Sequence, residues 1–278
     1  MAHGIVDRIA GGTAGAGRRR VPRAAQLALL VAVAGSLAGC TSDAFTRLGM
    51  PKPITTQGKL TLTLWQGSWI AALAVGVLVW GLVIWTVIFF RKRSDELPPQ
   101  VRYNLPIEVL YTVVPFIMVA VLFYFTARDE NTIDKLSARP DVVVNVTGFQ
   151  WAWEFQYPQY GIQVVGQPVN TATIGSYPGP QLVLPQGETV RFNLTSPDVI
   201  HSFWVPAFLF KRDVIPGHPN HFQITTTTTG TFSGRCSELC GMYHSEMLFT
   251  VKVVSKPQFQ RYVAAQKLAQ RAAAGSVQ

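Results

Sequence analysis

Two long apolar runs constrain the fold of this chain more than any other feature of its sequence. The first covers residues 69–90 and contains no charged side chain, and the second covers residues 107–126. About 20 apolar residues in a helix are enough to cross the hydrocarbon core of a bilayer. The composition agrees, because 48% of the residues are hydrophobic and only 14% are charged. We therefore expect a two-helix transmembrane hairpin over residues 64–127 rather than an ordinary soluble domain.

Basic residues in the loop between the two runs predict the orientation of this hairpin. Residues 91–93 read Arg-Lys-Arg and Arg102 follows, against two acidic residues. Because Lys and Arg are enriched in cytoplasmic loops, we expect this loop inside the cell and both termini outside. The formal net charge is +9, but no basic stripe interleaved with aromatic residues marks a nucleic-acid groove. The charge indicates targeting and topology, and we expect no nucleic-acid partner.

The N-terminal 39 residues have the features of a removable signal peptide. A basic segment at residues 18–23 precedes an apolar stretch at 24–33 that is too short to span a bilayer. The sequence Leu37-Ala38-Gly39-Cys40 follows and resembles the lipobox of bacterial lipoproteins. We expect removal of residues 1–39, lipid on the Cys40 thiol, and an extracytoplasmic segment at 40–63 on a bacterial plasma membrane. The alternative is an ordinary signal peptide that leaves Cys40 unmodified.

The chain after residue 128 has the pattern of a β-sandwich. Short runs with period-2 alternation, rich in β-branched and aromatic residues, are separated by Gly and Pro. The predicted strands cover residues 142–147, 150–157, 181–184, 189–194, 222–225 and 247–254. Residues 256–278 have a helical pattern without a further apolar span. The predicted fold is therefore a membrane-anchored all-β protein, with an extracytoplasmic sandwich at 128–255 and a C-terminal helix or tail.

A cluster of metal-ligand residue types lies near the end of this domain. Cys236, Cys240, His244 and Met247 have the spacing C-x-x-x-C-x-x-x-H-x-x-M, so one turning loop can bring them to one centre. His201 is the natural candidate for a second imidazole, because it follows a strand and a Ser-Pro turn. Thiolate, imidazole and thioether form a soft to borderline ligand set that favours copper.

Other interpretations of these residues remain open. Cys236 and Cys240 could form a disulfide, as paired cysteines often do outside the cytoplasm. Two cysteines and two histidines could also make a closed structural zinc site, and the histidines could be ordinary surface residues. Met247 favours copper, because zinc rarely takes a thioether whereas copper electron-transfer sites often do.

Further segments carry a specific resemblance. They are Asp198-Val-Ile-His201-Ser-Phe-Trp-Val-Pro206, Lys211-Arg-Asp-Val-Ile-Pro-Gly217 and Gln150-Trp-Ala-Trp153. Together with the cysteine loop and the preceding apolar runs, they resemble the copper A-containing subunit II of haem–copper cytochrome c oxidases. The resemblance covers residues from about 64 to about 256. It implies a cupredoxin-like sandwich holding two copper ions, with these ligands: Cys236 and Cys240 as bridges, His201, His244, the weak ligand Met247, and the backbone carbonyl of Glu238.

The same resemblance implies a function and partners. A c-type cytochrome would deliver electrons through Trp151, and the copper centre would pass them to haem held only by subunit I. Oxygen would be reduced to water there, coupled to proton translocation, in a complex with subunits I and III. Trp151 could instead be ordinary sandwich core. Ala152 departs from the aromatic residue common in relatives, and carboxylates such as Asp198 are candidates for steering a basic partner.

Two carboxylates have additional expected roles. The resemblance implies that the Glu238 side chain binds a magnesium ion at the interface with subunit I, and the alternative is a solvent-facing carboxylate. Glu108 lies at the start of the second apolar run and matches a family carboxylate at the mouth of a proton pathway. Its alternative is interfacial snorkelling without a proton-transfer role.

Three other protein classes share part of this pattern. A quinol oxidase subunit II has the helices and sandwich but lacks the copper ligands. A copper chaperone or storage module has little use for the hairpin or for Trp151. A nitrous oxide reductase has the copper loop without a membrane hairpin. The combination of hairpin and complete ligand set favours the cytochrome c oxidase subunit.

Overall fold

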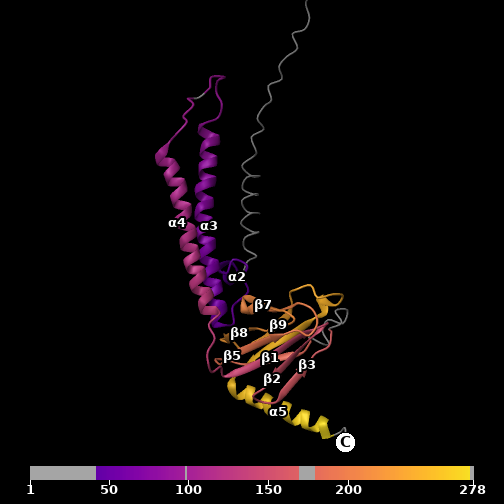
Figure 1. Cartoon of the computed structure of the whole chain (residues 1–278). Coiled ribbons are helices and arrows are strands. Elements are labelled where there is room, and N and C mark those ends of the chain that lie inside the picture. The colour runs from indigo at the N-terminus through magenta and orange to yellow at the C-terminus, as the bar shows by residue number, and fades with distance from the viewer. Residues whose placement is uncertain (1–41, 98, 169–178, 276–278) are drawn as a thin grey trace, which may run out of the picture. The chain divides into compact units, whose positions relative to one another are not determined.

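The computed structural model describes residues 42–97, 99–168 and 179–275. The signal segment 1–39 and the proposed lipidation site Cys40 lie outside these residues. The chain divides into two units, Met1–Thr46 and Arg47–Gln278. The short helix α2 (Ser42–Thr46) belongs to the first unit, and all elements named below belong to the second. Figure 1 shows the helical hairpin and the strands of the second unit.

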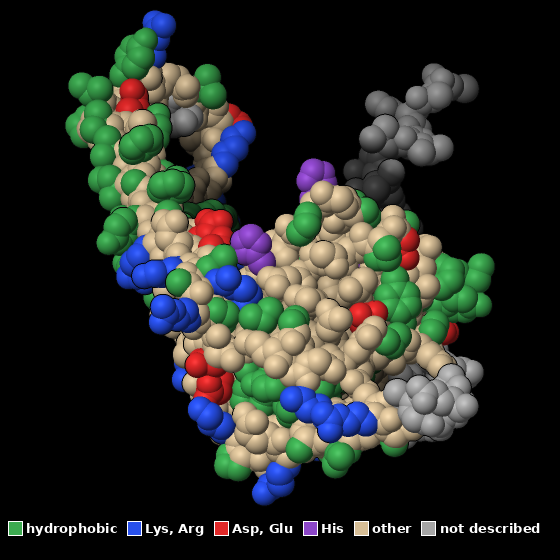
Figure 2. All heavy atoms as spheres, turned by 60° about the horizontal axis from the view of Figure 1, so that its bottom comes forward, with side chains coloured by type: hydrophobic (Ala, Val, Ile, Leu, Met, Phe, Trp, Pro, Cys, Tyr) green, Lys and Arg blue, Asp and Glu red, His purple; other side chains and the backbone are tan. Residues whose placement is uncertain are grey.

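Two helices, α3 (Thr56–Phe89) and α4 (Leu105–Ile133), are long and apolar enough to cross a membrane. This confirms the expected helical pair. Their hydrophobic side chains are largely exposed in the isolated chain, and Figure 2 shows them in green along the hairpin. Pro115 lies inside α4 without ending it, as membrane helices allow. Both helices extend into polar sequence beyond the predicted range 64–127.

The segment before α3 is bound to the sandwich. Ile54 and Thr55 are almost fully buried. The backbone N–H of Ile54 donates to the carbonyl of Ala207 across 3.1 Å, and its carbonyl accepts from the N–H of Thr227 across 2.7 Å. Thr55 forms an isolated bridge with Thr226. Backbone hydrogen bonds therefore fix the start of the first apolar helix to the sandwich.

The C-terminal part is a cupredoxin-like sandwich of two five-stranded sheets, as predicted. One sheet has the order β3-β2-β1-β5-β8 and the other β4-β10-β9-β6-β7. The strands β1 and β5 pair in parallel, as do β4 and β10, and the other neighbours are antiparallel. The strands are β1 (Val142–Phe149), β2 (Ala152–Tyr157), β3 (Ile162–Val165), β4 (Gln181–Pro185), β5 (Thr189–Thr195), β6 (His201–Val205), β7 (Phe210–Val214), β8 (Asn220–Thr225), β9 (Gly230–Cys236) and β10 (Leu248–Val254).

Four of these strands, β3, β6, β7 and β9, are absent from the predicted set. Two of them, β6 and β9, were not predicted because their composition differs from that of a typical strand. Strand β6 buries His201 and Ser202 beside apolar residues, so polar and apolar positions do not alternate. Strand β9 contains two glycines, Gly230 and Gly234, which are depleted in strands. The ring of Phe249 explains Gly234, because an added Cβ there would lie 2.2 Å from it.

The core between the sheets consists largely of aromatic rings. Phe192 stacks on Phe222 with centroids 4.7 Å apart, and Phe203 stacks on Phe249 at 4.9 Å. Trp153 is fully buried and packs edge-on against Phe203 and Phe249. Helix α5 (Lys256–Gly275) occupies the expected C-terminal helical stretch and buries Phe259 and Val263 against the domain. This rigid core lies directly beneath the predicted ligands.

Candidate metal centre

Neighbouring strands bring the first ligands together. His201 is the first residue of β6, and Cys236 is the last residue of β9. These strands pair antiparallel, with Phe203 opposite Cys236. The connection from β9 to β10 supplies Cys240, and the N–H of Cys236 donates to the Met247 carbonyl across 3.1 Å to close that loop. The ligand positions are therefore tied to the backbone of one sheet.

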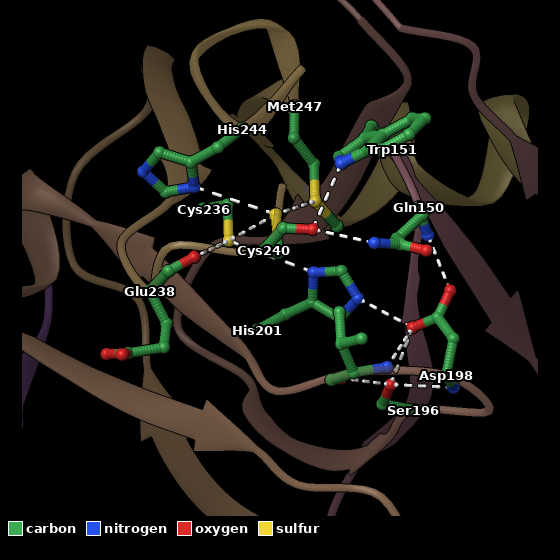
Figure 3. Close-up of polar contacts among 11 residues, drawn as sticks. Gln150, Trp151, Ser196, Asp198, His201, Cys236, Glu238, Cys240, His244 and Met247 are labelled. Carbon is green, nitrogen blue, oxygen red and sulfur yellow. Dashed lines mark hydrogen bonds and ion pairs between the residues drawn. The ribbon is translucent and has the colours of Figure 1, made fainter. Parts of the chain in front are cut away.

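The predicted ligands converge on two thiols. The ligand atoms of His201, Cys236 and Cys240 all lie within 4.8 Å of one another, and all three residues are buried. The two sulfurs are 3.9 Å apart, and His201 Nδ1 is 3.9 Å from Cys236 Sγ. Figure 3 shows the three side chains facing one point.

Three further donors surround the same sulfurs. His244 Nδ1 lies 3.6 Å from Cys240 Sγ, and Met247 Sδ lies 3.9 Å from it. The backbone carbonyl oxygen of Glu238 lies 3.2 Å from Cys236 Sγ. Met247 is fully buried, whereas His244 is partly exposed. The two thiols and the four other predicted donor groups thus lie together at one centre.

The geometry decides between the interpretations of the cysteine pair. A disulfide requires sulfurs about 2.05 Å apart, and these lie 3.9 Å apart as free thiols. A closed zinc site of two cysteines and two histidines leaves no role for the thioether of Met247, which faces Cys240. Two thiols shared by two sets of nitrogen, sulfur and carbonyl donors fit a copper A centre.

Comparison with known proteins agrees with this chemistry. The model of the family "Cytochrome C oxidase subunit II, periplasmic domain" matches residues 142–254, the span from the start of β1 to the end of β10. A probable cytochrome c oxidase subunit 2 of Streptomyces avermitilis is 51% identical, covering 88% of this chain and 86% of that protein. The chain belongs to the cytochrome c oxidase subunit II family.

Other members of the subunit II family are also similar. The cytochrome c oxidase subunit 2 of Mycobacterium tuberculosis is 39% identical, covering 88% of this chain and 82% of that protein. A further similar protein is the periplasmic domain of subunit II of cytochrome oxidase from Bradyrhizobium japonicum, which has a crystal structure. Its sequence is 32% identical to that of this chain. It covers 48% of this chain and 99% of that chain, with a TM-score of 0.44.

The two thiols of this subunit II protein differ in acidity before metal binding. Burial opposes ionisation of Cys236, but hydrogen bonds from His201 and nearby backbone groups lower its pKa to about 7. Burial and the adjacent Cys236 thiolate raise the pKa of Cys240 to about 12. The first negative charge therefore forms on Cys236, and a bound cation would favour ionisation of Cys240 as well.

Asp198 positions the imidazole of His201, the first of the two proposed histidine ligands. The sequence gives one signal for this role, which is that Asp198 lies three residues before His201. Its Oδ1 lies 2.9 Å from His201 Nε2, and its Oδ2 accepts the N–H of Gln150 across 2.7 Å. Burial raises the Asp198 pKa, but these hydrogen bonds outweigh it and the pKa is lowered. The carboxylate favours the His201 tautomer with its Nδ1 lone pair directed toward the thiols.

The two tryptophans of the predicted strand 150–157 occupy different environments. Trp153 is fully buried, and its indole N–H donates to the Met247 carbonyl across 3.2 Å. Trp151 is partly exposed, and its indole N–H donates to the Cys240 carbonyl across 3.1 Å. Gln150 donates to the same carbonyl across 2.8 Å, a contact that the sequence did not suggest. Trp153, not Trp151, is the core tryptophan of this sandwich.

The remaining predicted residues lie away from the thiols. The Glu238 side chain is exposed and points away from the sulfurs in Figure 3. Glu108 lies in the first turn of α4, where its Oε1 accepts the backbone N–H of Asn104 across 2.9 Å. Glu108 therefore caps the N-terminus of α4. Its expected role in proton uptake stays a prediction.

Proposed function

We propose that this chain accepts single electrons from a c-type cytochrome at a dinuclear copper A centre. It then passes them to haem in subunit I, where oxygen is reduced to water with coupled proton translocation. The observation that carries this proposal is the convergence of four donor groups on two free thiols 3.9 Å apart. Cys236 and Cys240 would hold the two copper ions between them, and the bound copper would supply reversible one-electron chemistry.

The chain's own contribution is to hold the ligands still. His201 and Cys236 are anchored at strand ends, and Met247 is fixed through its backbone to Cys236. Burial of both cysteines limits access of water to the sulfurs. Ligands held by a packed sheet and by second-layer hydrogen bonds change little when the charge of a centre changes. Such a site is suited to fast electron transfer without bond making.

We propose Trp151 as the residue through which electrons enter. Its partial exposure and its hydrogen bond to the Cys240 carbonyl support this role. The indole offers a flat surface for a haem edge on one side and a short bonded path to a thiol ligand on the other. The alternative of a core role is less well supported, because Trp153 already fills the core position.

We propose an assembly that is supported by family membership, by the charge pattern of the loop and by the lipobox-like sequence before Cys40. Residues 1–39 are removed, Cys40 carries lipid, and segment 40–63 leads into a hairpin at 64–127 whose loop is cytoplasmic. The copper domain at 128–255, with its tail 256–278, then lies on the outer face of a bacterial plasma membrane. Subunits I and III are the proposed partners in the membrane. The exposed Glu238 carboxylate is the proposed magnesium ligand toward subunit I, and Glu108 is the proposed proton-pathway residue.

The direct test is to load the full-length chain, in detergent, with copper and to titrate it with a reductant. We expect about two copper ions and about one electron per chain, as shared thiolates require. A reduced c-type cytochrome should be oxidised by the loaded chain and not by the copper-free chain. A single bound copper per chain, or equal oxidation by the copper-free chain, would contradict the proposal.

A further inference from the structure

A cavity of about 280 Å³ lies between α3 and α4, at the end of the hairpin nearer the sandwich. Figure 1 shows the two helices side by side. On α3 the cavity extends from Thr63 to Ala71, and on α4 it extends from Val121 to Asp129. Each stretch rises by about 12 Å along its helix. The cavity therefore runs along the helices rather than across them.

The walls of this cavity are mainly apolar. Leu64, Val121 and Phe125 contribute hydrocarbon surface. The hydroxyls of Thr63 and Ser68 also line the cavity, but each donates to the carbonyl four residues earlier in its own helix, across 3.0 and 2.8 Å. A cavity without free polar groups stays dry. These walls therefore suit an apolar ligand better than water.

Small residues on α3 open the cavity. Gly67, Ser68 and Ala71 all line it. In membrane helices such residues usually let two helices approach closely. Here Gly67 faces open space, because an added Cβ would meet nothing within 4 Å. The small side chains thus leave room between the helices instead of bringing the helices into contact.

An ion pair lies at one end of the cavity, and we call Arg128 and Asp129 the rim. Asp129 is 4% exposed, and its Oδ1 accepts from Arg128 Nε and Nη2 across 2.9 and 2.8 Å. Asp129 Oδ2 accepts no hydrogen bond from the residues that the structure describes. The Arg128 side chain is 52% exposed, and its guanidinium lies 5.0 Å from the centre of the Phe125 ring. The rim therefore offers an accessible cation and a carboxylate oxygen that is free to accept.

The rim lies at the level where a bilayer changes from hydrocarbon to headgroups. The apolar run of α4 ends at Thr126, two residues before Arg128. On α3, Trp65 and Trp69 pack edge-on with centroids 5.7 Å apart, and tryptophan is enriched at the headgroup level. The apolar walls therefore lie at the depth of acyl chains, and the rim lies at the depth of headgroups.

We propose that this cavity binds one acyl chain of a phospholipid with a primary-amine headgroup, such as phosphatidylethanolamine. The acyl chain contacts the apolar walls, Arg128 binds the phosphate, and Asp129 Oδ2 accepts from the ammonium group. Sites for small organic ligands span about 300–1,000 Å³, so the cavity has room for part of one acyl chain rather than for a whole lipid. The bound chain fills the space between α3 and α4 and braces the hairpin. This site goes beyond the proposed function and does not depend on copper.

Native mass spectrometry of the full-length chain in detergent, with phosphatidylethanolamine added, tests the cavity. We expect one retained lipid per chain. Gly67→Leu places a side chain in the cavity and should abolish retention. Gly81→Leu is the matched control, because Gly81 is an exposed glycine of α3 that does not line the cavity, and this variant should retain the lipid. Equal retention by the two variants, or none by the wild-type chain, would overturn the proposal.

A second substitution tests the headgroup. Asp129→Asn should lower the affinity for phosphatidylethanolamine by at least about tenfold, because the ammonium group loses a charged acceptor. The affinity for phosphatidylglycerol, which has no amine, should not fall. Glu130→Gln removes the exposed neighbouring carboxylate and should change neither affinity. An equal loss for both lipids, or no loss for either, contradicts the proposed recognition of the amine.

Two other occupants of the cavity would give different results. If a lipid attached to Cys40 fills it, phosphatidylethanolamine will bind only to a Cys40→Ala chain. If a helix of subunit I covers it, the lipid will be lost when the two subunits are purified together. Either result overturns the proposal. Retention of the lipid in the assembled complex, with the same loss in Asp129→Asn, supports it.

Discussion

The indole N–H of Trp151 donates a hydrogen bond to the backbone carbonyl of Cys240, across 3.1 Å. Cys240 carries one of the two central thiols, so an exposed ring is connected to a ligand sulfur through one hydrogen bond and a few covalent bonds. Gln150 donates to the same carbonyl. The partly exposed ring and the loop that supplies the proposed metal ligands are therefore positioned together.

Replacing Trp151 by Gln should slow electron transfer from a c-type cytochrome strongly while leaving copper binding intact. The substituted residue is partly exposed, so little packing is lost and the unfolding free energy should fall by less than about 1 kcal/mol. Stopped-flow reduction and thermal unfolding of the copper-loaded chain measure the two effects. A destabilised variant with a normal reduction rate per copper would rule out Trp151 as the electron-accepting residue.

Trp153→Gln is the matched control for this experiment. Trp153 is fully buried among Phe203 and Phe249, so its loss should cost about 3–5 kcal/mol of unfolding free energy. The difference between the small loss of stability in Trp151→Gln and the large loss in Trp153→Gln distinguishes a surface role from a core role. Similar destabilisation by both substitutions would contradict the assignment of the two positions.

Cys236→Ser or Cys240→Ser should abolish the dinuclear centre while the sandwich still folds, because the thiols contribute metal ligands rather than strand pairing. Met247→Leu should retain copper and raise its reduction potential, since a buried apolar side chain replaces a weak ligand of similar volume. Copper analysis, circular dichroism and redox titration measure these outcomes. A two-copper spectrum in either cysteine variant would show the ligand assignment to be wrong.

Asp198→Asn should raise the reduction potential by on the order of 40 mV, equivalent to about 1 kcal/mol for one electron. Removing the anion at 2.9 Å from His201 Nε2 makes the imidazole a weaker donor to oxidised copper. Glu130→Gln, which removes an exposed carboxylate near the end of α4, is the control and should not shift the potential. An unchanged potential in Asp198→Asn would restrict this residue to fixing the loop.

Gly58→Ala should weaken the attachment of α3 to the sandwich. An added Cβ at Gly58 would lie 2.6 Å from the Phe208 carbonyl oxygen and 3.0 Å from Thr55 Oγ1, which leaves it no room. We expect a loss of about 1–3 kcal/mol in thermal or denaturant unfolding of the full chain. Gly67→Ala, whose added Cβ meets nothing within 4 Å, should be neutral. Equal stability of the two variants would contradict the tight contact.

The sequence predicted the fold class because its strongest signals are local. Uninterrupted apolar runs mark α3 and α4, and regular alternation marks strands such as β1, whose residues are buried at every second position. Strands β6 and β9 were not predicted because the requirements of their neighbours changed their composition. Strand β6 buries the polar residues His201 and Ser202, and β9 has Gly234 where the Phe249 ring leaves no room for a side chain. Requirements imposed by neighbours in space are not visible in a local pattern.

The proximity of the proposed ligands was predictable from residue type and spacing, whereas the surroundings of these residues were not. The loop motif placed Cys236, Cys240, His244 and Met247 together, and the structure brings His201 to them from another strand. The inward hydrogen bonds of Asp198 and the packing of Tyr243 on Trp151 depend on side-chain direction. These contacts give Asp198 a role in positioning His201, while its expected role in steering a basic partner stays a prediction.

The central claim is that two copper ions share the thiolates of Cys236 and Cys240, and electron paramagnetic resonance tests it most directly. The oxidised, copper-loaded full-length chain should show one unpaired electron with hyperfine splitting from two equivalent copper nuclei. Cys236→Ser should lose that pattern. A wild-type spectrum with splitting from a single copper nucleus would contradict the account.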